Sequence, residues 1–359
     1  MQLTAQNIIG YLTDQALVPH EKVLNGQFCW YAIRSRNQVF IIRDQQGGGL
    51  FLKQANSDKA LIMKEANALH ILHHFSDFES VKPFIPQFYS YHPELHVLVT
   101  EYLQGARSVL ELTELRGQLS LSQAKAMSEV MARFHADLRN DLDRDPSLQF
   151  FDPELPWILK LPNVTNYAKE VVLEQIRQDE FLLHKLDEVA RGWSNTSLIH
   201  GDIHLANFMI KESENGDQLK LTDWEMANIG DPLWDLAGLM QAYLAHGLRF
   251  SSASSDHYQL PESKAYWSRE HVHKVWAVIW ESYGHLMNWS VTETGLAAEK
   301  VVGFIAARLL QSAAELNRVS PEFLAPGAWA MIAEARTYLR QPQQVIRALD
   351  TSTHLSHEF

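Results

Sequence analysis

The stretch Ser197–Asn207, which reads S-L-I-H-G-D-I-H-L-A-N, decides how the rest of the chain is interpreted. The carboxylate of Asp202 is followed, five residues later, by the amide of Asn207. A second carboxylate, Asp223, follows in L-K-L-T-D-W-E after a predicted hairpin across Asn215-Gly216. Carboxylate and amide oxygens are the ligands that a hard cation such as Mg²⁺ prefers. The three side chains together therefore predict a site that holds Mg²⁺ and ATP.

Size and composition limit the classes of protein that this chain can belong to. Its 359 residues are enough for two domains with separate cores. No apolar run approaches the roughly 18 residues that span a membrane, and no basic segment precedes an apolar run at the N-terminus. We therefore expect a cytoplasmic protein without a membrane partner. The net charge of −12 argues against a nucleic-acid partner and is compatible with a cationic substrate.

The single cysteine, Cys29, excludes an internal disulfide and a thiolate metal cluster. It lies in the apolar run F-C-W-Y-A-I, which predicts a buried side chain.

Residues 1–103 are predicted to form an N-terminal domain on a small antiparallel sheet. Thr4 is expected to cap a helix that ends near Leu12. Gly47-Gly48-Gly49 is interpreted as a hairpin tip and not as a phosphate loop, because a strand follows it where a phosphate loop would open a helix. Alternating and β-branched residues predict strands at Phe28–Arg34, Val39–Arg43, Leu50–Gln54, Phe88–Tyr91 and Val97–Tyr102.

One helix, Ser57–Phe75, interrupts these strands. Glu65 falls on its apolar face, so this carboxylate needs a partner, and Lys53 at the end of the preceding strand is the nearest one. His70, His73 and His74 have the spacing of metal ligands, but no acidic residue or cysteine clusters with them. We interpret these histidines as part of a solvated face.

Residues 104–359 are predicted to form a larger, mainly helical domain, with Gly105 marking the boundary between the lobes. The polar stretch Ser251–Lys264 is either a disordered insert or a lid over a substrate pocket. Periodic apolar positions predict helices at Leu121–Leu138, Tyr167–Val189, Leu233–Leu244, His271–Trp289, Leu296–Asn317 and Gly327–Arg340. The order of elements indicates the α+β class, with two lobes.

Phosphoryl transfer from ATP needs few groups, and the chain offers each of them. A lysine fixed by a carboxylate holds the phosphates, an aspartate orients the attacking hydroxyl, and an amide and a second aspartate hold Mg²⁺. The sequence contains these groups in the order Lys53, Glu65, Asp202, Asn207 and Asp223. This pattern favours a kinase.

Three motifs between Leu198 and Ala237 resemble those of the aminoglycoside phosphotransferase and choline kinase superfamily. They read L-I-H-G-D-I-H-L-A-N-F, L-T-D-W-E and G-D-P-L-W-D-L-A. The resemblance implies a two-lobed protein-kinase-like fold, with a small antiparallel β-sheet N-lobe that contains one key helix and a larger, mainly α-helical C-lobe. It also implies transfer of the γ-phosphoryl group of ATP, with Mg²⁺, to the hydroxyl of a small molecule such as an aminoglycoside, an aminoalcohol or a sugar.

The resemblance further implies roles for individual residues. The glycine-containing nucleotide loop of the family is only partly kept in Ser35–Phe40, where Asn37 would contact the nucleotide. Either Arg36 would contact phosphate in place of the missing glycines, or the loop would fold away from ATP. The remaining roles are Asp202 as catalytic base, Asn207 and Asp223 as Mg²⁺ ligands, Lys53 with Glu65 as the phosphate-holding pair, Glu101, Tyr102 and Leu103 as the adenine hinge, and Asp235 with His200 as braces of the catalytic loop.

Two alternatives stay open. H-G-D in place of H-R-D, D-W-E in place of D-F-G, and the lack of A-P-E oppose an ordinary protein kinase, although a peptide Ser/Thr hydroxyl remains a candidate acceptor. A non-catalytic nucleotide-binding regulatory module is favoured by the glycine-poor loop and opposed by the intact set of Asp202, Asn207 and Asp223.

Trp224 and Trp234 are predicted to pack in cores.

Overall fold

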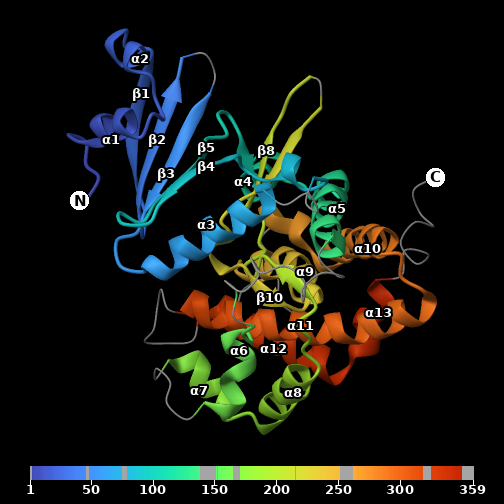
Figure 1. Ribbon diagram of the computed structural model, residues 1–359. Coiled ribbons are helices and arrows are strands. Elements are labelled where there is room, and N and C mark those ends of the chain that lie inside the picture. The colour runs from blue at the N-terminus through green and yellow to red at the C-terminus, as the bar shows by residue number, and fades with distance from the viewer. Residues whose placement is uncertain are drawn as a thin grey trace. The chain divides into compact units, whose positions relative to one another are not determined.

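The structure is a computed structural model that describes residues 2–45, 48–74, 79–137, 151, 153–164, 170–214, 216–250, 262–317 and 325–349. Its contacts divide the chain into two compact units (Figure 1). Unit 1 comprises Met1–Ser108, Gln149–Phe151 and Asn207–Ala227, and unit 2 comprises Val109–Leu148, Asp152–Ala206 and Asn228–Phe359. The predicted domain boundary after residue 103 stays a prediction. The hairpin that begins at Asn207 packs with unit 1.

Unit 1 is built on an antiparallel sheet of five strands in the order β1-β2-β3-β5-β4. A second antiparallel sheet joins β6, β8 and β9. The elements of this unit are α1 (Ile8–Asp14), α2 (His20–Leu24), β1 (Phe28–Arg34), β2 (Gln38–Asp44), β3 (Gly49–Gln54), α3 (Lys59–His74), β4 (Phe88–His92), β5 (Val97–Glu101), β6 (Arg107–Ser108), β8 (Phe208–Lys211) and β9 (Gln218–Leu221), with short 3-10 turns at Lys82–Phe84 and Trp224–Met226.

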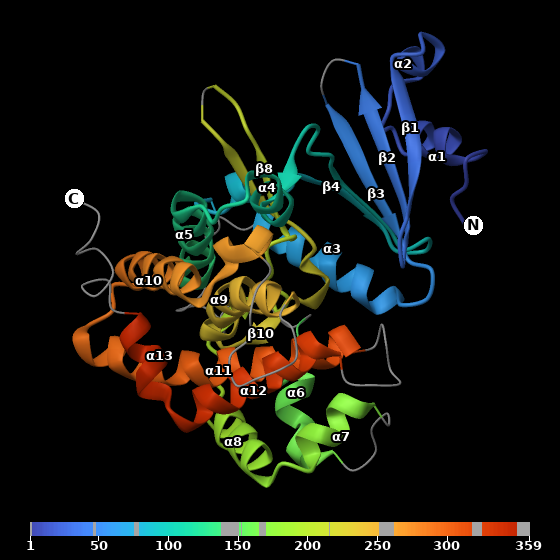
Figure 2. The ribbon, with the colours of Figure 1, turned by 180° about the vertical axis from the view of Figure 1, so that it is seen from behind.

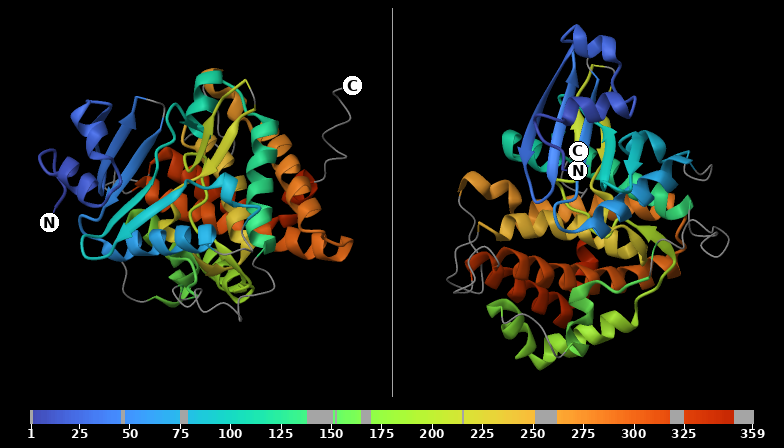
Figure 3. Two further views of the ribbon diagram at one scale, coloured as in Figure 1. Left: turned by 45° about the horizontal axis from the view of Figure 1, so that its top comes forward. Right: turned by 60° about the vertical axis from the view of Figure 1, so that its left-hand side comes forward.

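The two faces of the five-stranded sheet serve different purposes, because successive side chains of a strand point to opposite faces. Phe40, Ile42 and Leu52 lie in a core with Ile8 and Leu12 of α1, which covers one face (Figure 3). Their neighbours in sequence, including Ile41, Phe51 and Lys53, line a pocket on the other. The alternation of the sequence therefore separates structural from pocket-lining side chains.

Unit 2 is mainly helical and adds one two-stranded pairing, β7 with β10. Its long helices pack around α9, which contacts α5, α10, α11 and α12 (Figure 2). The elements are α4 (Val109–Arg116), α5 (Leu121–Asp137), α6 (Trp157–Lys160), α7 (Val171–Arg177), α8 (Glu180–Arg191), β7 (Ser197–Ile199), β10 (Asn228–Gly230), α9 (Pro232–Leu248), α10 (Arg269–Leu286), α11 (Val291–Asn317), α12 (Pro326–Arg340) and α13 (Pro342–Ala348), with 3-10 turns at Leu161–Asn163 and Glu262–Trp267.

The start of α9 follows directly from its sequence. The Leu233 amide donates to the side chain of Asp231, and Pro232 occupies the first helical position, where no amide is needed. Trp234 in the first turn is buried, as is Trp224 in unit 1, which confirms the predicted packing role of both. In the core of unit 2 the Trp276 indole donates to the Met240 carbonyl at 2.7 Å.

Three local predictions are wrong. Helix α1 begins at Ile8, because Thr4 does not cap it but donates its amide to the Asn7 side chain at 2.7 Å. Cys29 is exposed, since β1 is an edge strand and this side chain points away from the core. The single helix predicted at Tyr167–Val189 is two helices, because Asp179 accepts hydrogen bonds from two amides at the start of α8.

Several predicted features fall wholly or partly outside the described residues. Gly47, Leu138 and Asn215 lie outside them, as do residues 165–169 of the predicted helix and 251–261 of the polar stretch. Within the described ranges, the structure contains no helix with both the length and the apolar character needed to span a membrane.

Gly230 of β10 gives a test of the packing in unit 2. An added Cβ would lie 2.6 Å from Ile199 Cδ1 and 2.7 Å from Trp193 Cζ2, so Gly230→Ala should lower the free energy of unfolding by about 1–3 kcal/mol. The matched control is Gly295→Ala in α11, where nothing lies within 4 Å and a gain of up to about 1 kcal/mol is expected. Urea denaturation measures both. Equal stability of the two variants would contradict the packing.

Candidate active site

Unit 1 contains a pocket of 550 Å³, within the usual size range of ligand sites. The sheet supplies Lys53, α3 supplies Glu65, and the segment from Asn207 to Trp224 supplies Asn207 and Asp223. Glu101, Tyr102 and Leu103, the predicted hinge, also line this pocket. Asn37 is buried and does not line it, whereas Ser35 does. The pocket therefore gathers most of the residues that the sequence predicts for nucleotide binding.

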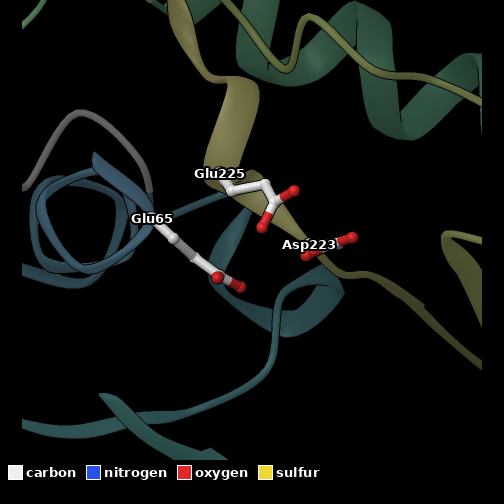
Figure 4. A group of neighbouring side chains, drawn as sticks. All are labelled: Glu65, Asp223 and Glu225. Atoms are coloured by element: carbon white, nitrogen blue, oxygen red, sulfur yellow. The ribbon is translucent and has the colours of Figure 1, made fainter. Parts of the chain in front are cut away.

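Three carboxylates surround the Lys53 ammonium. Its Nζ lies 2.6 Å from Asp223 Oδ1, 2.9 Å from Glu65 Oε2 and 2.9 Å from Glu225 Oε2. The three acidic side chains converge from α3 and from the segment after β9 (Figure 4). The predicted pairing of Lys53 with Glu65 is confirmed, and Glu225 is an additional partner.

The charges of this cluster control one another. Burial by itself lowers the pKa of Lys53, but Glu65, Asp223 and Glu225 together raise it above its usual value, so the ammonium stays charged. Burial raises the pKa of Glu65 to about 7, although Lys53 opposes the rise. One buried cation cannot fully neutralise three carboxylates, and a proton on Glu65 relieves the excess negative charge.

Asp223 has a backbone conformation that few non-glycine residues adopt. Its φ of 67° and ψ of 59° are left-handed. This backbone follows β9 directly and precedes the turn Trp224–Met226, and the Asp223 side chain is 39% exposed. The amide and hydroxyl of Thr222 both donate to the Asn207 carbonyl, at 2.9 Å and 3.0 Å. The β8–β9 hairpin therefore brings Asn207 next to Asp223, as the sequence predicts.

The predicted nucleotide loop and the predicted adenine hinge differ in the contacts that their polar groups make. Arg36 forms an ion pair with Glu225, so its guanidinium is already held by the carboxylate cluster. In the hinge, the Tyr102 amide donates to the Gly49 carbonyl at 3.0 Å. Because this amide already has a protein acceptor, the predicted adenine would have to form its hydrogen bond with a neighbouring backbone group.

The three histidines of α3 are engaged in contacts with one another and with the backbone. The rings of His70 and His74 stack with centroids 4.1 Å apart, and His73 Nε2 lies 2.8 Å from the Pro86 carbonyl oxygen. Across the described part of the chain, the one group of acidic, histidine or cysteine residues close enough to share an ion is Glu65, Asp223 and Glu225, which already surrounds Lys53.

Unit 2 contains a second pocket, of 370 Å³, lined by Asp202. Asp202 follows β7, and its side chain is 38% exposed with the His204 ring 3.6 Å away. Burial by itself raises the pKa of Asp202, but His204, Arg308 and His200 together lower it well below its usual range. The carboxylate is therefore ionised throughout the neutral range.

Asp235 fixes the backbone just before Asp202. Its Oδ2 accepts from the His200 amide at 2.6 Å, and its Oδ1 accepts from the Gly201 amide at 2.9 Å. Gly201 has a φ of 80°, a conformation that glycine adopts without strain. His135 Nε2 lies 3.3 Å from the same carboxylate. The bracing contact predicted for Asp235 is present, and His200 takes part through its backbone.

Three residues at these sites were not predicted from the sequence. Glu225 was visible in the D-W-E motif but had no predicted role, whereas its contact with Lys53 shows that it belongs to the cluster. His135 and Arg308 had no local signal, because each reaches the Asp202 loop or its brace from a helix distant in sequence.

The sequence profile of the phosphotransferase enzyme family matches residues 32–266, about two thirds of the chain. The chain belongs to this family. It is therefore a phosphotransferase, as the motifs predict. No curated protein sequence matches it.

Solved structures similar to this phosphotransferase have a kinase-like fold. Ethanolamine kinase from Plasmodium vivax has a TM-score of 0.60 and 12% identity over 92% of this chain and 87% of that one. Choline kinase from Cryptosporidium parvum has a TM-score of 0.60 and 15% identity over 97% and 99%. Aminoglycoside 2'-phosphotransferase-IIIa has a TM-score of 0.54 and 14% identity over 94% and 99%. The predicted fold class is thus confirmed.

The raised pKa of Glu65 predicts how stability depends on pH. The folded pKa of about 7 lies above the ordinary value of 4.5, so folding takes up a proton between these values. The stabilising contribution is complete below about pH 4.5 and is lost as the pH rises through about 7. Glu65→Gln, which cannot titrate, should flatten the pH dependence of the free energy of unfolding.

Urea denaturation from about pH 5 to about pH 8 measures this dependence. The control is Glu79→Gln in the same unit, because the Glu79 side chain is 70% exposed. A slope that is the same in wild type and Glu65→Gln would contradict the proton uptake.

Proposed function

We propose that this phosphotransferase transfers the γ-phosphoryl group of ATP to a hydroxyl group of a small molecule, with Mg²⁺. The observation that carries the proposal is the charged Lys53 ammonium inside the unit 1 pocket, held there by carboxylates of α3 and of the segment after β9. A lysine fixed in this way is the group that holds the phosphates of a nucleotide in kinases.

The proposal assigns the nucleotide to the unit 1 pocket. Lys53 exchanges part of its carboxylate contacts for phosphate oxygens, while the buried Glu65 keeps it in place. Asn207 and Asp223 are adjacent in the β8–β9 hairpin, line the pocket and offer oxygen ligands, so these residues fit Mg²⁺ and would hold it. When bound, Mg²⁺ neutralises charge on the transferring phosphate. Glu101, Tyr102 and Leu103 would contact the base, and the contact of Asn37 with the nucleotide stays a prediction.

The acceptor is assigned to the unit 2 pocket, where Asp202 acts on its hydroxyl group. The hydroxyl oxygen bonds to the γ-phosphorus, the bond from that phosphorus to the bridging oxygen of ADP breaks, and the hydroxyl proton passes to Asp202. A carboxylate with a lowered pKa is a weak base, so its main contribution is to orient the hydroxyl and to accept the proton late. Asp235, with the His200 and Gly201 amides, holds the loop for this task.

The lining of the unit 2 pocket favours an acceptor rich in hydrogen-bonding groups. Gln241, Gln311, Ser312 and Arg249 line it, and the buried Oε1 of Gln311 has no hydrogen-bond donor among the described residues. An aromatic cage for a quaternary ammonium is missing from the described lining, which contains no Trp, Tyr or Phe. These features support a sugar- or aminoglycoside-like compound over choline.

The charge of the acceptor has to be judged from this pocket and not from the whole chain. Asp202 and Glu315 contribute two carboxylates, and Arg249 and Arg308 contribute two guanidinium groups. The net charge of −12 is therefore not concentrated here, so the support for a sugar- or aminoglycoside-like acceptor comes from the hydrogen-bonding groups of the lining and not from charge. A peptide hydroxyl remains the alternative acceptor, and the assay described below includes it.

Calorimetry of ATP binding tests the nucleotide site. We expect ATP to bind more tightly with Mg²⁺ than without it, and Asp223→Asn to remove most of that difference, because it replaces a charged ligand by a neutral amide. Asp217→Asn is the control, since Asp217 is an exposed residue of the same hairpin. Binding that is unaffected by Mg²⁺ in the wild type would contradict the assignment.

An ADP-release assay with a panel of hydroxyl compounds tests the transfer itself. The panel contains an aminoglycoside, a sugar, ethanolamine, choline and a serine peptide, and we expect the aminoglycoside or the sugar to give the largest stimulation. Asp202→Asn should lower kcat by about 10²- to 10⁴-fold and leave ATP affinity largely unchanged.

Asp187→Asn on α8 is the control for this assay, because Asp187 is 40% exposed and pairs with Arg191. Stimulation by choline alone would contradict the preference for a sugar- or aminoglycoside-like acceptor. Full activity of Asp202→Asn would contradict the proposed action of Asp202 on the hydroxyl group.

A further inference from the structure

Arg308 of α11 is a buried cation that contacts the backbone on both sides of Asp202. Its side chain donates from Nη1 to the Gly201 carbonyl at 3.1 Å and from Nη2 to the Ile203 carbonyl at 2.8 Å. Arg308 is only 5% exposed. A guanidinium is planar and holds its donors in a rigid fork, so these two bonds fix two carbonyl groups relative to each other. The residue between those carbonyls is Asp202.

Two residues beside the Arg308 guanidinium favour this contact. The Trp234 ring lies 5.1 Å from the guanidinium carbon, and its indole nitrogen also donates to the Gly201 carbonyl, at 3.4 Å. A Cβ at Gly238 would lie 3.0 Å from Arg308 Nη2 and 3.1 Å from the Ile203 oxygen. Trp234 and Gly238 are both on α9, so this helix supplies a surface for the guanidinium and the space that it needs.

The charge of Arg308 is not used in an ion pair with any carboxylate that the structure describes. A buried guanidinium without such a partner is costly unless a nearby negative charge compensates for it. The groups whose charges act on Asp202 are His204, Arg308 and His200, and of these Arg308 alone is charged at every pH of interest.

We propose that Arg308 is a positioning residue that clamps the Gly201 and Ile203 carbonyls and thereby holds the Asp202 carboxylate in the acceptor pocket. The inference rests on the proposed function of Asp202. It adds that the orientation of this carboxylate depends on a side chain of α11, more than 100 residues later in the chain. The clamp has two separable parts, the fork that fixes the backbone and the charge that faces the carboxylate.

Two substitutions separate these parts. Arg308→Lys keeps the charge but cannot bridge two carbonyls as a planar fork, so kcat should fall on the order of 10-fold to 10²-fold with KM for ATP unchanged. Arg308→Met removes both parts, so kcat should fall at least as far and the pKa of Asp202 should rise. The Asp202 carboxyl can be titrated by ¹³C NMR on aspartate-labelled protein and assigned with Asp202→Asn.

Gly238→Ala tests the clamp without changing Arg308. Its Cβ would force the guanidinium or the Ile203 carbonyl to shift by a few tenths of an ångström, which disturbs the hydrogen bond between them, so kcat should fall while the charge remains. This variant and Arg308→Lys keep the proposal testable if Arg308→Met fails to fold. Arg336→Met is the matched control, since Arg336 lies in unit 2, forms an ion pair with Asp179 and does not line the Asp202 pocket.

The outcomes distinguish the clamp from the proposed function. The titration of Asp202 does not need turnover, so it reads the clamp even if the ADP-release assay finds no acceptor and the proposed function fails. A purely structural role predicts lower thermal stability in the Arg308 variants and in Arg336→Met alike, with the Asp202 titration unchanged. An unaltered titration in Arg308→Met, or a kcat within about twofold of wild type in folded Arg308→Lys and Gly238→Ala, overturns the proposal.

Discussion

The ion cluster around Lys53 is the constraint on which unit 1 depends. Three carboxylates from two separate segments converge on one ammonium, so β3, α3 and the turn after β9 must meet at that point. A buried charge is tolerated only when it is paired, and here one cation serves three anions. The remaining excess of negative charge explains the raised pKa of Glu65 and the additional contact from Arg36. Under the proposed function, Asp223 would exchange its contact with Lys53 for one with Mg²⁺.

The charge balance in unit 2 is the opposite of that around Lys53, because Asp202 is a single carboxylate that is kept ionised by several nearby groups. Its charge is balanced by His204 and Arg308, and the backbone before it is tied to the buried Asp235. The carboxylate itself remains partly exposed to a pocket of 370 Å³. Buried groups on α9 and α11 therefore position a carboxylate that lines a pocket, and rigid helices give a precision that a loop alone lacks.

Prediction from sequence succeeded where one local pattern decided the outcome. The strand at Phe28–Arg34 has the predicted bounds, and Trp224 and Trp234 pack as expected, because apolar periodicity and burial point the same way. It failed where the surroundings of a residue in the folded chain decided its burial or its hydrogen-bond partner. Cys29 has apolar neighbours in the sequence but lies on an edge strand, and Thr4 binds Asn7 where a cap for the first turn was expected. Edge position and capping partner depend on how segments meet.

The sequence by itself determined the family and the α+β class, because the motifs within Leu198–Ala237 are close enough together to be recognised along the chain, whereas the roles of their residues stay predictions. It also determined the pairing of Lys53 with Glu65, since a carboxylate on an apolar helix face requires a nearby cation. Only the tertiary structure decided that Glu225 completes the cluster, that Asn37 does not line the pocket, and that Arg308 reaches the backbone around Asp202. These contacts join segments far apart in sequence, and packing, not periodicity, brings such segments together.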